Sequence, residues 1–99
     1  MKATLDERVK KVYNSFSDTD QARIRGYINL FREHKFILSG KYLKKLKNNL
    51  WELRPGNIRV LFGIVNQEMI IVNVFKKKTQ KTPTNEIKIA EDRLKEYKL

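Results

Sequence analysis

The residues best suited to chemistry lie in one stretch, 50–81, whose sequence is LWELRPGNIRVLFGIVNQEMIIVNVFKKKTQK. The stretch is typical of three short strands joined by tight turns, and successive side chains of a strand point to opposite faces. Glu52 and Arg54 should therefore share one face, and Arg59 on the next strand can reach that face diagonally. Lys76 to Lys78 leave the end of the third strand, next to the second strand. A carboxylate, two guanidiniums and several ammonium groups would then line one surface.

Such a set could cleave RNA without a metal ion. The ribose 2′-OH would attack the adjacent phosphate, with Glu52 taking its proton and with Arg54 and Arg59 stabilising the phosphorane charge. Lys77 or Lys78 would protonate the leaving 5′-oxygen. Glu–Arg pairs are also common as solvated salt bridges on exposed sheets, and the residue chemistry alone favours this simpler interpretation.

The positive charge of the chain is clustered. The formal net charge is +11, and residues 41–59 hold six basic residues against Glu52 alone, a net of +5. Residues 76–81 add four lysines and no acid. Clustered charge favours a polyanionic partner such as nucleic acid or an acidic protein tail, although lysines also simply keep small proteins soluble. The lysines expected to contact RNA are Lys44, Lys45, Lys47, Lys76 and Lys81.

Composition narrows the possible functions. The 99 residues suit one domain, and their 40% hydrophobic content suits a globular core. Without cysteine the chain forms no disulfide, thiolate metal site or thiol nucleophile. No metal-ligand spacing, phosphate loop or dinucleotide motif is present, so no cofactor is expected. No apolar run is long enough to cross a membrane, and the charged start is unlike a signal peptide, so we expect a cytoplasmic protein without a membrane partner.

The spacing of apolar residues in the rest of the chain predicts the helices that support the charged surface. Apolar residues spaced by three and four predict helices over about 4–16 and 18–35, and Thr82 with Pro83 predicts the N-cap and first residue of a third helix ending near Tyr97. Gly26 would allow the first two helices to pack closely. Residues 41–47 are expected to form a short helical turn or an irregular segment. The predicted fold is α+β: two N-terminal helices, an antiparallel sheet of three to four strands and a C-terminal helix, with the helices on one sheet face.

Two segments carry a resemblance to a known family. GKYLKKLKNNLWELRPGNIRVLF and VFKKKTQKTPTNEIKIAEDRLKEY together resemble the RelE/ParE toxin superfamily, and within it the phage Gp49-like, HigB-type branch. The resemblance covers roughly residues 17–97. It implies the compact RelE-like α+β fold over a single domain, 1–99. It also implies a type II toxin, usually a ribosome-dependent endoribonuclease that cuts mRNA and so inhibits translation.

The same resemblance assigns partners and roles. It implies three partners: a helix-turn-helix, HigA-type antitoxin, the ribosome and mRNA. The toxin would contact operator DNA only through its complex with the antitoxin. Arg59 matches the strand arginine that contacts the scissile phosphate, and Lys77 matches a basic residue at the end of the last strand. Glu52 matches a position that carries a lysine in some members and a glutamate, proposed as the base, in others.

The chain departs from the family pattern in two places. Many relatives carry an aromatic residue or a histidine near the start of the last helix or at the end of the last strand, where this chain has Lys78, Thr79 and Pro83. Relatives also begin with a strand, and Met1 to Thr4 is too short for a full one. We therefore expect that sheet edge to be missing or supplied by a partner.

Two other functions stay open from the sequence. The superfamily includes ParE-like gyrase inhibitors, which lack the nuclease residues, and a basic domain can bind nucleic acid without catalysis. The retained arginines and lysines favour the ribonuclease.

Overall fold

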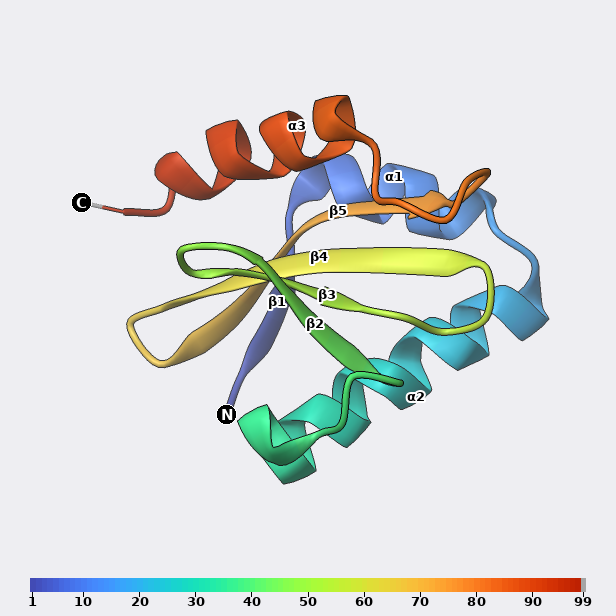
Figure 1. Cartoon of the computed structure of the whole chain (residues 1–99), viewed down its shortest axis with the longest axis horizontal. Helices are drawn as coiled ribbons and strands as arrows, with labels where there is room; N and C mark the ends of the chain where they lie inside the picture. Colours follow the sequence, from blue (N-terminus) through green and yellow to red (C-terminus); the bar gives the residue numbers. More distant parts are fainter. Residues whose placement is uncertain (99) are drawn as a thin grey trace.

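The computed structural model describes residues 1–98, which fold into an α+β domain, as predicted (Figure 1). No helix within this range is long and apolar enough to cross a membrane. In chain order the elements are β1 (Ala3–Leu5), α1 (Glu7–Ser15), α2 (Asp18–His34), the 3-10 turn η1 (Lys35–Ile37), β2 (Leu43–Lys47), β3 (Leu50–Leu53), β4 (Ile58–Val65), β5 (Glu68–Lys76) and α3 (Thr84–Lys95).

The sheet has five strands in the order β1-β5-β4-β3-β2. Strands β3 to β5 form the predicted antiparallel meander, and β2 extends it by pairing antiparallel with β3. Strand β1 pairs in parallel with β5. The expectation that the N-terminal edge strand is missing is therefore wrong, and the sheet has five strands where three to four were predicted. Three residues suffice because the ladder continues on both sides of them: Met69 N–H donates to the Lys2 carbonyl, and Asp6 N–H donates to the Ile71 carbonyl.

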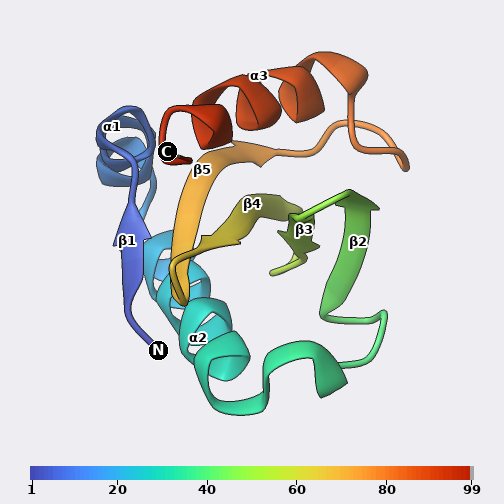
Figure 2. The same cartoon turned by 90° about the vertical axis from the view of Figure 1, so that its left-hand side faces the viewer.

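Helices cover both faces of the sheet, so the prediction that they share one face is wrong. Figure 2 shows α3 on one side of the sheet and α2 on the other. Alternation along β4 explains this arrangement: Val60 and Phe62 pack with buried residues of α1 and α2, whereas Leu61 packs beneath α3. Each helix buries its apolar stripe against one of the two apolar faces that the strand pattern creates.

Residues 41–47, expected to be a helical turn or irregular, contain the edge strand β2. Leu43 and Leu46 suggested a helical face because they are three residues apart. In a strand the same spacing places two side chains on opposite faces, and Leu43 indeed packs in the α1–α2 cluster while Leu46 packs against the α3 cluster. Pairing with β3 across the tight turn at Asn49, whose φ is 52°, overrides the local pattern.

Close packing and a buried polar network fix α3 on the sheet. Gly63 of β4 leaves room for Leu94, because a Cβ at position 63 would lie 2.5 Å from a Leu94 methyl carbon. At the far end of α3 the Tyr97 hydroxyl donates to Oδ2 of the buried Asp6 at 2.6 Å. Gly26, by contrast, has no neighbour within 4 Å of the position that a Cβ would take, so the expectation that it permits close helix packing is wrong.

Candidate active site

The structure brings Glu52, Arg54 and Arg59 together on the α3 side of the sheet, as strand alternation predicts. Arg54 Nε lies 3.6 Å from Glu52 Oε2, and Arg59 Nε lies 3.9 Å from Glu52 Oε1. The Glu52 side chain is 1% exposed and that of Arg59 is 5% exposed, whereas Arg54 is 29% exposed. We call these three residues the glutamate–arginine cluster. Arg54 is the member most accessible to a ligand.

The strand ladder and the turn before β4 set the geometry of the cluster. Glu52 pairs with Leu61 of β4, two residues from Arg59. Arg59 Nη1 donates to the carbonyls of Gly56 and Ile58, at 2.9 and 2.7 Å. Gly56 has a φ of 59°, a conformation that glycine adopts without steric cost. The guanidinium is thus held in one orientation by its own turn.

Electrostatics in the cluster are set by burial and by the neighbouring charges. Burial lowers the pKa of the Arg59 guanidinium, the nearby Glu52 carboxylate opposes this shift, and Arg54 adds to it. A guanidinium nevertheless stays protonated in proteins. One carboxylate facing two guanidiniums leaves a net positive charge, which suits binding of a phosphate group.

Thr82 is hydrogen-bonded to the cluster, although the sequence predicts it to be the N-cap of α3. Its hydroxyl donates a hydrogen bond to Glu52 Oε1 instead, and the N-cap position falls to Pro83, which makes no side-chain cap. A hydrogen bond to a carboxylate is stronger than one to a neutral group, so this bond orients the Thr82 side chain toward the sheet. Residues 77–83, which we call the covering loop, are thereby tied to the buried carboxylate.

A basic pocket of about 210 Å³ lies beside Thr82. It is open at the surface between β2, the covering loop and the first turns of α3. Lys44 is the strand partner of Glu52, so the pocket adjoins the glutamate–arginine cluster. The pocket is lined by Lys44, Lys45, Leu46, Lys81, Thr82 and Ile87.

The other predicted lysines are distributed around this site. Lys77 N–H donates to the Asn57 carbonyl at 2.7 Å, which places the start of the covering loop beside the turn before β4. Lys78 is exposed on the same loop. Lys76 points to the opposite face, where it pairs with Asp20 at 3.4 Å, and Lys47 lies near the β2–β3 turn, so the structure brings neither of these two to the cluster.

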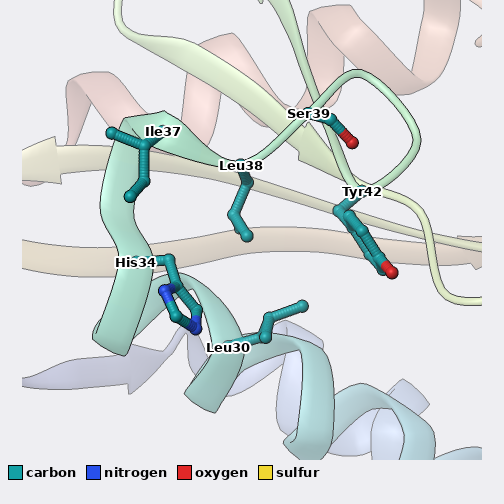
Figure 3. Close-up of a pocket in the computed structure, with 6 residues that line it drawn as sticks. All are labelled: Leu30, His34, Ile37, Leu38, Ser39 and Tyr42. Carbon is teal, nitrogen blue, oxygen red and sulfur yellow. The ribbon is translucent and has the colours of Figure 1, made fainter.

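His34 lies at the C-terminal end of α2, on the other side of the sheet from the cluster. It borders an apolar hollow of about 290 Å³ together with Leu30, Ile37, Leu38, Ser39 and Tyr42 (Figure 3). Within residues 1–98, no three His, Asp or Glu side chains gather closely enough to hold a metal ion.

The family comparison extends over most of the chain. The model of the family described as phage-derived protein Gp49-like matches residues 11–95. No curated protein shows significant similarity to the chain.

Solved structures share the fold at low sequence identity. The archaeal RelE–RelB complex from Pyrococcus horikoshii contains a chain that is 17% identical, with a TM-score of 0.66 over 81% of this chain and 97% of that one. The isolated RelE toxin of E. coli is 13% identical, with a TM-score of 0.64 over 88% and 95% of the two chains. A chain of the toxin–antitoxin complex RelBE2 from Mycobacterium tuberculosis is 16% identical, with a TM-score of 0.60 over 77% of this chain and 96% of that one.

Proposed function

Because this chain belongs to the phage-derived Gp49-like family and has the fold of the RelE toxins, we propose that it is the toxin of a type II toxin–antitoxin system. We infer further that it is a ribosome-dependent endoribonuclease of the HigB type, which cuts mRNA and inhibits translation. One observation carries this proposal: the buried Glu52 carboxylate faces two arginines next to a pocket rimmed by lysines.

In the proposed reaction the RNA supplies its own nucleophile. The 2′-oxygen forms a bond to the adjacent phosphorus while the bond to the 5′-oxygen breaks, leaving a cyclic phosphate and a 5′-hydroxyl. Arg54 and Arg59 stabilise the extra negative charge on the phosphorane, since guanidinium groups match phosphate oxygens in geometry and charge. Lys77 or Lys78 on the covering loop protonates the 5′-oxygen. No metal or cofactor takes part.

Glu52 has two roles in this proposal. At 1% exposure, with Oε1 bound by Thr82, it orients the two arginines in the closed site. It takes the 2′-OH proton once RNA displaces the Thr82 end of the covering loop, while the start of the loop, which carries Lys77 and Lys78, stays bonded to Asn57. A base must lie within hydrogen-bond reach of the proton that it abstracts, so cleavage requires the buried carboxylate to become accessible to the RNA.

The basic residues around the site have a role in binding. Lys44, Lys45 and Lys81 line the pocket beside the cluster and contact the RNA backbone. Lys47 and Lys76 lie outside it and contact more distant phosphates of mRNA or ribosomal RNA. Formal net charge of +11 favours association with the ribosome, a large polyanion.

We propose that the partner protein is an antitoxin. The Pyrococcus horikoshii structure is a complex of RelE with RelB, which supports a partner of this kind for a chain with the same fold. A helix-turn-helix, HigA-type antitoxin would neutralise the toxin in the cytoplasm and carry it to operator DNA.

Primer extension on mRNA tests the proposed activity. In a purified translation reaction, the wild-type protein should cut the message when ribosomes are present and leave naked mRNA intact. A supercoiling assay with DNA gyrase should show no inhibition. Absence of ribosome-dependent cuts would contradict the proposed ribonuclease activity. Trapped gyrase–DNA complexes would instead indicate a gyrase inhibitor.

A further inference from the structure

Phe36, in the turn η1, presents an aromatic ring to solvent. Its ring packs edge-on against the buried Phe31, with centroids 5.2 Å apart, and tilts against Trp51 of β3 at 4.6 Å. These contacts fix the ring from the inside, yet 49% of Phe36 stays exposed. A rigid ring with an open face loses little conformational entropy when a flat ligand stacks on it. We call Phe36 and Trp51 the aromatic platform.

Positive charge borders this platform. The Lys45 ammonium lies 5.3 Å from the centroid of the Trp51 ring, and Lys45 and Trp51 are partners across the β2–β3 ladder. Lys45 also lines the basic pocket beside Thr82. Strand β2 is the edge of the sheet, so this lysine connects the pocket on the α3 side with the platform on the α2 side.

Rigid aromatic rings next to lysines are the means by which proteins bind unpaired bases, because every base has a flat face and every nucleotide a phosphate. We propose that the aromatic platform stacks one unpaired nucleobase of single-stranded RNA whose backbone crosses the β2 edge along Lys45. This inference rests on the proposed function and adds a base-binding subsite to it. It supplies an aromatic contact that the covering loop, with its lysines and threonines, lacks.

A protein segment is the competing occupant. Ile37 is 83% exposed, and it forms part of the apolar hollow drawn in Figure 3, next to Phe36 in the chain. A partner's apolar side chain could fill that hollow. The lysine that joins the platform to the basic pocket favours RNA, because each nucleotide carries a flat base for the platform and a phosphate for the lysine.

Trp51, the single tryptophan, provides the probe for this proposal. A short oligonucleotide of 2′-O-methyl adenosines, which lacks the 2′-OH nucleophile, should quench Trp51 fluorescence as it binds. Replacing Phe36 by Ala should weaken binding roughly 5- to 150-fold, the loss expected for one stacked base. Phe36→Leu, which keeps apolar volume in the turn, should weaken binding in the same direction. An abasic oligonucleotide of equal length should bind wild type and both variants alike.

The controls separate the possible failures. Val12→Ala removes a similarly exposed apolar side chain from α1 and should leave binding unchanged. Equal affinity of Phe36→Leu and wild type for the adenosine oligonucleotide would overturn the platform. So would loss of antitoxin binding by the Phe36 variants with RNA affinity intact, because the surface would then be a protein interface. Neither binding result depends on cleavage. If the protein binds RNA through Phe36 but does not cut mRNA on the ribosome, only the proposed ribonuclease activity is refuted.

Discussion

Thr82, in the loop before α3, donates its hydroxyl hydrogen to Oε1 of Glu52, a buried carboxylate in the sheet. The bond joins residues 30 positions apart and closes the covering loop over the glutamate–arginine cluster. In this closed arrangement Glu52 and Arg59 are both buried. The Thr82 bond therefore anchors the end of the covering loop, as the bond from Lys77 N–H to the Asn57 carbonyl anchors its start.

Substituting Thr82 tests that bond. Thr82→Val removes the hydroxyl but keeps the shape, so the free energy of unfolding should fall by about 1.5–3 kcal/mol, the value of a hydrogen bond to a charged group. Thr82→Ser keeps the donor and should lose less than half of that. Urea denaturation followed by circular dichroism gives both values. Equal stability of the Val variant and wild type would show that Thr82 does not anchor the loop.

Glu52 should be needed for cleavage beyond its structural contribution. Glu52→Gln keeps the volume and an oxygen for Thr82 but removes the proton acceptor, so single-turnover cleavage of ribosome-bound mRNA should slow by about 10²–10⁴-fold. Glu52→Ala leaves the Arg59 guanidinium buried without its counter-charge and should also lose about 3–5 kcal/mol of stability. If the folded Gln variant cuts as fast as wild type, Glu52 takes no proton.

The hydrogen bonds that Asp6 accepts from Arg8 and Tyr97 predict that the stability of the fold depends on pH. Hydrogen bonds from Arg8, and to a lesser degree from Tyr97, hold the pKa of the Asp6 carboxyl far below its usual range. An aspartate in the unfolded chain titrates near 3.9, so the unfolded state takes up this proton first. The stabilisation from Asp6 is therefore complete above about pH 5 and is lost as the pH falls toward the lowered value.

The matching measurement compares wild type with Asp6→Asn. At neutral pH wild type should be more stable by about 1.5–3 kcal/mol, and the difference should shrink on acidification. Asp92→Asn, which alters an exposed pair with Lys88, provides the control and should show little difference at any pH. A difference that stays constant between neutral and acid pH would contradict the role of Asp6.

Two glycines should respond in opposite directions to the same substitution. Gly63→Ala places a methyl group 2.5 Å from Leu94 and 2.7 Å from the Asn49 carbonyl, which should cost about 1–3 kcal/mol. Gly26→Ala lies within α2 and meets nothing within 4 Å, so its helix propensity should raise stability by up to about 1 kcal/mol. Thermal unfolding of both variants checks the pair. A neutral Gly63→Ala would mean that α3 is free to shift.

Local rules predict the parts of this molecule in which neighbouring residues decide the structure. The apolar stripe of α2 and the alternation in β3 and β4 are of this kind. The same alternation places Glu52 and Arg54 on one face, so the cluster follows from the sequence once the strands are recognised. Its nuclease role stays a prediction.

Long-range contacts decide the parts that local rules miss. Strand β2 has a spacing of leucines that also suits a helix, and only its pairing with β3 selects the strand. Thr82 precedes a proline as a good N-cap would, but the charged acceptor that captures its hydroxyl comes from a strand 30 residues earlier. Phe36 likewise meets Trp51 only after folding, and nothing near either residue in the chain signals that contact.

The most direct test of the proposed ribonuclease measures mRNA cleavage on the ribosome by Arg59→Lys, Arg54→Ala and wild type. Arg59→Lys keeps the charge but loses the forked donor, so its cleavage rate should fall by about 10²–10³-fold, and Arg54→Ala should also cut more slowly. Arg25→Ala removes an exposed arginine from α2 and should cut like wild type. Undiminished, ribosome-dependent cutting by a folded Arg59→Lys variant would contradict the assignment of the active site to this cluster.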